Sequence, residues 1–243
     1  MKRRSFLLAL AARPAQVDFL VQGALEAEIA VLRESLKGRR EMREEAWTFW
    51  TGTIGRKSVV VSLTGVGPAQ AAAATVVGAH VFRPRAVINQ GTAGAHSRTL
   101  KLFDIVLGER TIDYSGYQSA HAEAGQGVDP RRWNPRLRYQ KGDSELLIAA
   151  QKMPNPHGKV VRGTIGSANQ FNRELDFIDW AHNAFGTDSE DMESAYAHEV
   201  CTSLNMRFLA IRMISDTEWE HPQFERIAGT YCAEFVTALI RSL

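Results

Sequence analysis

Cysteines and metal-ligand patterns are both scarce in this chain of 243 residues. Its two cysteines, Cys201 and Cys232, form no CxxC pair and are too few to define a disulfide framework. The seven histidines are scattered, and none stands at metal-ligand spacing from another histidine or a cysteine. We therefore expect two buried free thiols, no metal and no cofactor.

The chain also lacks an excess of one charge and a long apolar run. Its formal net charge is +2, so electrostatics gives no reason to expect a nucleic acid partner. No apolar run approaches the roughly 20 residues that a transmembrane helix needs, so we expect no membrane span. With 44% hydrophobic residues, the composition is that of an ordinary globular protein.

Apolar runs typical of buried strands alternate along the chain with segments of helical character. We expect one domain over residues 16–243, with a mixed, mostly parallel central sheet flanked by helices on both faces. Strands are expected at 17–22, 47–54, 58–63, 86–89, 104–112, 159–165 and 207–214, and helices at 24–36, 69–82, 143–152, 173–185, 193–204 and 226–241. A short strand or turn is expected to lead to Met192.

Two further stretches are expected to be irregular. The charged residues 37–45 are interpreted as a solvated turn. Residues 113–142 are rich in Gly, Arg, Tyr and Trp and show no clear period. They are interpreted as a long loop, and loops of more than about 15 residues usually have a function.

Residues 1–15 stand apart from the rest of the chain. A basic head is followed by a short apolar body, as in a secretory signal, and Arg3-Arg4-Ser5-Phe6-Leu7 resembles the twin-arginine type. The apolar body has only about eight residues, and neither Arg13 nor Pro14 suits a cleavage site. The sequence leaves export to the periplasm and a cytoplasmic location equally open.

Three acidic residues fall where predicted strands end. Asp216 follows the apolar stretch 208–214, and Glu28 and Glu193 lie at comparable strand-to-helix junctions. In open α/β sheets the chemistry sits just beyond the carboxyl ends of the strands. A carboxyl group at the rim of a pocket there can be kept protonated and used as an acid. The three acids together therefore indicate an enzymatic reaction.

Two glycine-containing segments also follow predicted strands. Gly65-Val66-Gly67-Pro68 lacks the third glycine of a dinucleotide fingerprint, and no acidic residue follows about 20 positions later. It is interpreted as a tight turn that lets the backbone approach a ligand. Gly91-Thr92-Ala93-Gly94 is either a similar ligand-binding turn or a plain β-turn.

Six segments together resemble a known family. They occur in the order and at the spacing typical of the nucleoside phosphorylase/nucleosidase superfamily, and most resemble its 5′-methylthioadenosine/S-adenosylhomocysteine nucleosidases. The resemblance covers residues 17–241, and its most specific part is the combination of Met192-Glu193 with Ser215-Asp216. The segments are 23–28, 66–67, 89–94, 104–106, 191–193 and 212–216.

This resemblance implies a hydrolase that cleaves the N-glycosidic bond of 5′-thio-substituted adenosines to adenine and a thioribose, without a cofactor. Asp216 would protonate N7 of the departing adenine. Glu28 would activate water, helped by Thr92 and Arg212. Bond cleavage builds positive charge on the sugar and negative charge on the base, so an acid at the base and a carboxylate at the sugar suit it.

The resemblance also implies a set of substrate contacts. Glu193 would accept hydrogen bonds from the ribose hydroxyls, with Met192 packed on the sugar. Phe171 would stack on the purine, with the backbone around it reading the base edge. Further contacts would come from Val66, Ala93, Gly94 and Ser215. Asp216 must be protonated while Glu28 and Glu193 are ionised, so their environments must differ.

Other functions stay open beside this one. Related phosphorylases typically carry an arginine just ahead of the glycine segment, where this chain has the uncharged Ile88-Asn89-Gln90. A phosphorylase needs cationic donors for the phosphate, so hydrolysis is favoured over phosphorolysis. A nucleosidase for another modified nucleoside and a non-catalytic nucleoside-binding protein are the remaining alternatives. By analogy with relatives we expect a homodimer.

Several positions depart from the family pattern. His96 follows Ala95 where a glycine and an aliphatic residue are usual, Asn169 stands where aspartate is common, and Asn172 stands where an aliphatic residue is usual. His96 is expected to be a structural or rim residue. These departures concern the identity of the nucleoside more than the type of reaction.

Overall fold

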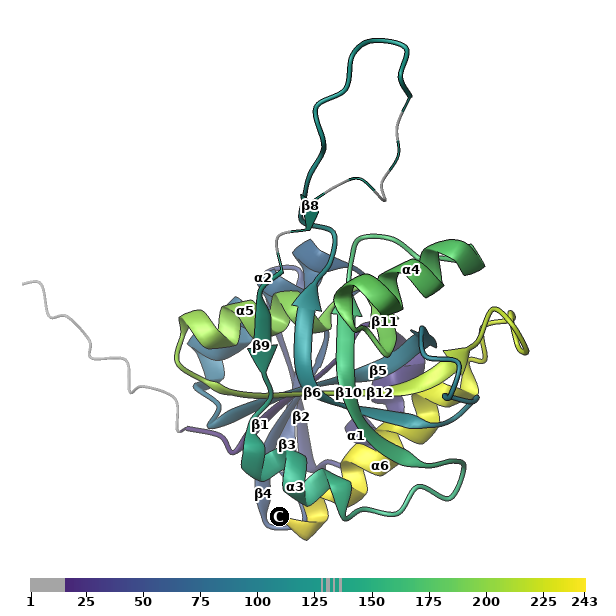
Figure 1. Cartoon of the computed structure of the whole chain (residues 1–243). Helices are drawn as coiled ribbons and strands as arrows, with labels where there is room; N and C mark the ends of the chain where they lie inside the picture. The colour runs from purple at the N-terminus through teal and green to yellow at the C-terminus, as the bar shows by residue number, and fades with distance from the viewer. Residues whose placement is uncertain (1–15, 128, 130–131, 133, 136) are drawn as a thin grey trace, which may run out of the picture.

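A ten-stranded β-sheet forms the centre of the protein, as the computed structural model in Figure 1 shows. The structure describes residues 16–127, 129, 132, 134–135 and 137–243, and the expected leader at 1–15 lies outside the described residues. The strands are β1 (Phe19–Gly23), β2 (Lys37–Glu44), β3 (Trp47–Ile54), β4 (Lys57–Leu63), β5 (Ala86–Ala95), β6 (Ile105–Asp113), β9 (Tyr139–Lys141), β10 (Val160–Ser167), β11 (Ser189–Asp191) and β12 (Arg207–Asp216).

The order of the strands is β11-β10-β6-β12-β5-β1-β4-β3-β2, and β9 pairs with β6. The centre is parallel, since β5 pairs in parallel with both β1 and β12, and β1 with β4. Antiparallel pairs join β12 to β6 and link β2, β3 and β4. The expected mixed sheet is confirmed, and its parallel centre brings the carboxyl ends of β1, β5 and β12 to the same edge.

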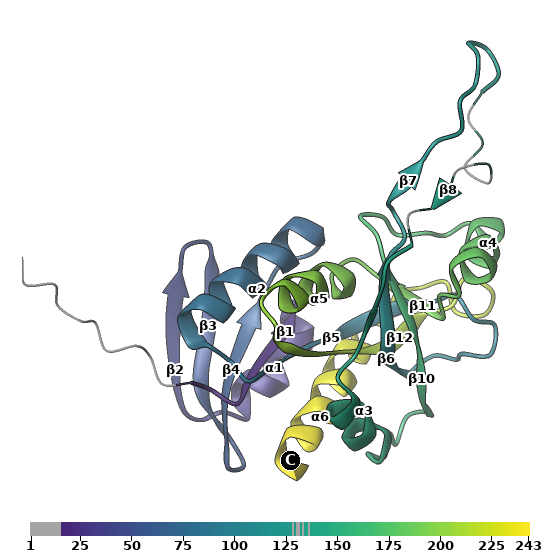
Figure 2. The ribbon, with the colours of Figure 1, turned by 60° about the vertical axis from the view of Figure 1, so that its left-hand side comes forward.

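Helices cover both faces of the sheet (Figure 2). One core cluster holds Ile29, Leu147 and Val236, so α1, α3 and α6 share a face. Phe82 and Cys201 belong to a second cluster, which α2 and α5 cover. The helices are α1 (Glu26–Glu34), α2 (Pro68–Phe82), α3 (Ser144–Gln151), α4 (Leu175–Phe185), α5 (Ser194–Ser203) and α6 (Ile227–Ser242).

Both cysteines are buried free thiols, as expected. Cys201 lies in α5 and Cys232 in α6, on opposite faces of the sheet. None of the helices in the described part of the chain has both the length and the apolar character that crossing a membrane requires.

The interpretation of 37–45 as a solvated turn is wrong. Residues Lys37–Glu44 form the edge strand β2, which pairs with β3 in an antiparallel register. Nearly all of its side chains are exposed, so the strand buries no apolar face and shows no alternating pattern. Backbone hydrogen bonds to β3 stabilise it, and charged residues are common on such edges.

Two strands run further than their apolar cores predict. β5 continues to Ala95, so the interpretation of 91–94 as a turn is wrong: these residues pair with β12. β12 itself continues to Asp216, and its register shifts between Ile214 and Asp216, which marks a β-bulge at Ser215. The bulge allows both Ser215 and Asp216 to line the same cavity.

The segment 113–142, expected as a long loop, is largely irregular but contains short strands. β7 (Tyr117–Gln118) pairs with β8 (Asn134–Pro135), and β9 pairs with the C-terminal part of β6 in an antiparallel register. The described part between β7 and β8 projects away from the sheet (Figure 1).

Candidate active site

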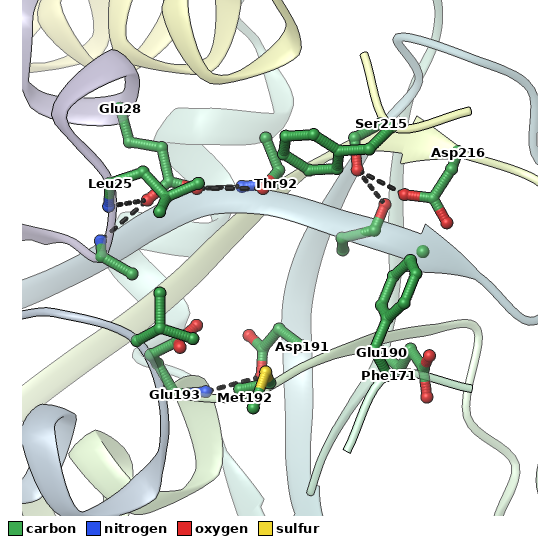
Figure 3. A pocket seen from close by; sticks show the side chains of 15 residues that line it. Leu25, Glu28, Thr92, Phe171, Glu190, Asp191, Met192, Glu193, Ser215 and Asp216 are labelled. Carbon is green, nitrogen blue, oxygen red and sulfur yellow. Dashed lines mark hydrogen bonds between the residues drawn. The ribbon is translucent and has the colours of Figure 1, made fainter. Parts of the chain in front are cut away.

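A cavity of about 260 Å³ lies at the edge of the sheet where β1, β5 and β12 end. Glu28, Glu193 and Asp216 all line it, although more than 20 residues separate each from the next. In Figure 3, Glu28 and Glu193 lie at one end and Asp216 lies at the other, near Phe171. The lining residues are Ala24, Leu25, Glu28, Val66, Thr92, Ala93, Gly94, Phe171, Glu190, Asp191, Met192, Glu193, Ser215, Asp216 and Phe224.

Every substrate-binding residue expected from the sequence is among these lining residues, and of the four expected catalytic residues only Arg212 is not. Arg212 lies behind the cavity and is 2% exposed. The lining also contains five residues that were not expected there from the sequence: Ala24, Leu25, Glu190, Asp191 and Phe224.

Four hydrogen bonds fix the Glu28 carboxylate. Glu28 lies in the first turn of α1, and its Oε2 accepts hydrogen bonds from the backbone N–H groups of Ala24 at 2.7 Å and Leu25 at 3.0 Å. The backbone N–H and the hydroxyl of Thr92 donate to Oε1 at 2.9 and 3.0 Å. A Cβ atom at Gly91 would lie 2.5 Å from this Oε1, so only glycine allows the strand to pass so close.

Arg212 holds the acids at the Glu28 and Glu193 end of the cavity from behind. Its Nε donates to Oδ2 of Asp191 at 2.5 Å, its Nη2 donates to Asn89, and Nη2 lies 3.8 Å from Oε2 of Glu193. Burial disfavours the charged guanidinium, but Asp191, Glu193 and Glu28 outweigh it and raise the pKa of Arg212. Arg212 interacts with Glu28 through its charge, since its hydrogen bonds go to Asp191 and Asn89.

Asp191 connects this arginine to the start of α5. Its Oδ1 accepts hydrogen bonds from the backbone N–H groups of Glu193 and Ser194, both at 3.1 Å, and so caps the helix. The cap places Glu193 where its Oε1 accepts a hydrogen bond from the backbone of Gly67 at 2.8 Å. The turn at 65–68 therefore approaches the site through its backbone, as its glycines suggested.

Burial changes the protonation of two acids in the cavity. It raises the pKa of Asp216 to about 6, and the nearby charges of Glu190 and Glu218 add to this effect while a hydrogen bond from Ser215 opposes it. Burial and the charge of Asp191 raise the pKa of Glu193 to about 7. A protonated Asp216 is thus accessible near neutral pH, but at that pH Glu193 is only partly in the expected ionised form.

Sequence reasoning missed a buried polar network at the Asp216 end of the cavity. Glu190 is 3% exposed, and its Oε2 accepts a hydrogen bond from the Tyr114 hydroxyl at 2.5 Å and lies 3.1 Å from Nε2 of His96. Asn172 donates to Glu190 through its backbone N–H at 2.9 Å and its side chain at 2.5 Å. His96 is a buried structural residue, as expected. His96 and Asn172 both depart from the family pattern, and these two departures were the only sign of the network in the sequence analysis.

A family model described as the phosphorylase superfamily matches residues 18–241. The chain belongs to the phosphorylase superfamily. The fold and the acidic site described above are therefore those of a superfamily member, and the nucleoside phosphorylase-like fold expected from the sequence is confirmed.

Several proteins resemble this superfamily member along nearly its whole length. A 5′-methylthioadenosine/S-adenosylhomocysteine nucleosidase of Anoxybacillus flavithermus is 27% identical, over 93% of this chain and 99% of the relative. A nucleosidase of the same name from Psychromonas ingrahamii is 28% identical, over 91% and 97%. The crystal structure of the Neisseria meningitidis nucleosidase in complex with methylthio-immucillin-A has a TM-score of 0.79 and 26% identity, and covers 93% and 99% of the two chains. The resemblance seen in the sequence is confirmed.

Proposed function

We propose that this protein hydrolyses the N-glycosidic bond of 5′-thio-substituted adenosines such as methylthioadenosine and S-adenosylhomocysteine, and releases adenine and a thioribose. One observation carries this proposal: Glu28, Glu193 and Asp216 line a single cavity of about 260 Å³. The relatives named above, which are nucleosidases for these two substrates, support it.

Asp216 acts at the base. In its protonated form it donates a proton to N7 of the purine as the C–N bond breaks, so the base leaves as a neutral molecule. Burial favours that protonated form, and Ser215, with its Oγ 2.7 Å from Oδ1, orients the carboxyl group. Phe171 lies on the same wall and stacks on the purine.

Glu28 and Glu193 act at the sugar. Glu28 takes a proton from the attacking water, and Thr92 fixes its carboxylate. Glu193 accepts hydrogen bonds from the ribose hydroxyls, which favour its ionised form and counteract its raised pKa when substrate binds. Met192 packs against the sugar, and Val66, with Leu25 and Phe224, supplies apolar surface suited to a thioether substituent.

Water is the nucleophile in this proposal because the cavity offers a phosphate ion little. None of the described residues that line the cavity is cationic. Arg212, which lies behind the cavity, is buried and already paired with Asp191. Glu28 and Glu193 would repel an incoming phosphate.

The test is the release of adenine from methylthioadenosine by the purified protein, with and without inorganic phosphate. We expect adenine to be released at the same rate in both, with free methylthioribose as the second product. Release that requires phosphate and yields a sugar phosphate would identify a phosphorylase. Tight binding without release would identify a nucleoside-binding protein.

Removing the Glu28 carboxylate tests its role in activating water. Glu28→Gln is expected to lower kcat for methylthioadenosine by about 10²- to 10⁴-fold, because the amide cannot accept the proton. Binding of adenine should change little, because Glu28 lies at the sugar end. Turnover by Glu28→Gln within a factor of about three of the unmodified protein would contradict the role.

The pH dependence of kcat/KM is a further prediction. A rise in pH through about 6 removes the required proton from Asp216, whereas a rise through about 7 creates the required carboxylate on Glu193. A bell with its maximum between pH 6 and 7 is therefore expected, with each limb falling about tenfold per pH unit. Activity that still climbs above about pH 8 would show that Asp216 is not the acid.

We also propose that the protein forms a homodimer. An apolar groove between α2 and α5 supports this proposal, since Val76 and Leu204 border it and are each 49% exposed. Light scattering coupled to gel filtration should give twice the chain mass of 27.0 kDa. Val76→Glu should shift the protein toward the monomer, and a wild-type protein that elutes as a monomer would exclude the dimer.

A further inference from the structure

The polar network behind the cavity has a use beyond support. We infer that the Glu190 carboxylate reads the base: it accepts a hydrogen bond from the amino group at C6 of adenine and so rejects purines that carry an oxo group there. This inference rests on the proposed function, because that function places N7 of the purine at Asp216.

Glu190 is built as a hydrogen-bond acceptor. Hydrogen bonds from Tyr114 and Asn172 and the ion pair with His96 surround the buried carboxyl group. Burial alone would raise the pKa of Glu190, but the hydrogen bond and charge of His96, with the other donors, hold it below its usual value. The group is therefore an ionised carboxylate, which can only accept hydrogen bonds.

The two oxygens of Glu190 have different surroundings. Oε2 faces the network, with the Tyr114 hydroxyl, the Asn172 side chain and His96 around it. Oε1 accepts one hydrogen bond from the described residues, from the backbone N–H of Asn172. A carboxylate oxygen can accept two, so Oε1 keeps a free acceptor position.

Oε1 lies on the side of Asp216. A Cβ atom at Gly94 would lie 3.8 Å from Oε1 of Glu190 and 3.0 Å from Oδ2 of Asp216, so both carboxyl groups border the same glycine. Figure 3 shows Asp216 and Glu190 at the same end of the cavity, with Phe171 close to both. A purine stacked on Phe171 would therefore meet both groups along one edge.

The chemistry of that edge favours an amino group. In a purine, the substituent at C6 is the next polar group beside N7, so a base with N7 at Asp216 turns its C6 substituent toward Glu190. An amino group donates to Oε1, whereas an oxo oxygen would face an ionised acceptor. Such a mismatch leaves buried groups unpaired and is the strongest source of discrimination between similar substrates.

The Asn172 backbone supports the same conclusion. From the sequence, the backbone around Phe171 was expected to read the base edge. In the structure the backbone N–H of Asn172 already donates to Glu190, so this donor is engaged within the protein. Recognition of the edge thus passes to the carboxylate. A purely structural ion pair between His96 and Glu190 would not need an oxygen at the cavity wall.

The test compares methylthioadenosine with 5′-methylthioinosine, which carries an oxo group at C6. The unmodified protein should prefer methylthioadenosine by at least about 100-fold in kcat/KM. Glu190→Gln should reduce this preference at least about tenfold, because an amide can donate to an oxo group. Glu218→Gln is the matched control: Glu218 also acts on Asp216 through its charge but does not line the cavity, so the preference should persist.

Binding of the free bases by the unmodified protein gives a second measurement, which does not depend on turnover or on the folding of a variant. Adenine should bind at least about tenfold more tightly than hypoxanthine or unsubstituted purine. Equal use of the two nucleosides, equal binding of the bases, or an unchanged preference in Glu190→Gln would overturn the inference. If adenine binds selectively, Glu190→Gln loses that selectivity and neither nucleoside is hydrolysed, the proposed hydrolysis fails while base reading by Glu190 stands.

Discussion

Asp216→Asn is expected to lower kcat for methylthioadenosine by about 10²- to 10⁴-fold while the protein folds normally. An asparagine has the shape of a protonated aspartic acid, and it can still hydrogen-bond to N7. It has no acidic proton to transfer, so the adenine would have to leave as an anion. The cost falls on the bond-breaking step and not on binding, so KM should change much less than kcat.

This prediction is checked by steady-state kinetics together with thermal unfolding of both proteins. A substrate analogue whose leaving group needs no protonation provides the control, because its hydrolysis should be nearly equal in the two proteins. Near wild-type hydrolysis of methylthioadenosine by Asp216→Asn would show that Asp216 is not the proton donor. A variant that unfolds early would instead point to a structural role for the carboxyl group.

Arg212→Met is expected to destabilise the protein by about 3–5 kcal/mol, because it leaves buried carboxylates without their cation. Arg212 is 2% exposed and pairs with Asp191, which in turn caps α5 and positions Glu193. Methionine fills much of the volume but cannot offset the charge. The activity remaining at low temperature should also be low, since Asp191 and Glu193 would move or take up protons.

Urea unfolding measures this effect, and the same strand offers a matched control. Arg207, also on β12, pairs with Asp143 and Glu145, but its side chain is 44% exposed. Arg207→Met should cost at most about 1 kcal/mol, because solvent screens the pair. If both variants lost similar stability, the buried charge of Arg212 would not be what holds the acids.

Much of the fold could be predicted from apolar runs bounded by turn residues. The strand 47–54, the hairpin to 58–63 and the helix after Pro68 lie within a residue or so of their expected bounds. β2 could not be found in this way, because an edge strand with both faces in solvent has no apolar pattern. The ends of β5 and β12 were missed because pairing with a neighbour extends them through Gly91 and Ser215, which are weak strand formers alone.

The residues of the site likewise divide into those that the sequence predicts and those that it does not. Glu28 and Asp216 could be found because each follows a strand that the sequence makes visible, and Glu193 because it follows the short strand or turn expected before Met192. Glu190 was missed because acids at the start of a helix are usually solvated, and its burial depends on partners far along the chain. Only the fold brings His96 and Tyr114 to it.

The bulge at Ser215 has a consequence for anyone who compares members of this superfamily. Side chains on a strand alternate between its two faces. The extra residue of the bulge, Ser215, therefore sets the face toward which the Asp216 carboxyl group points. An alignment that closes a one-residue gap here would match Asp216, the proposed proton donor, with a residue on the opposite side. The count of residues at this strand end thus carries information about the orientation of Asp216 that residue identity alone does not.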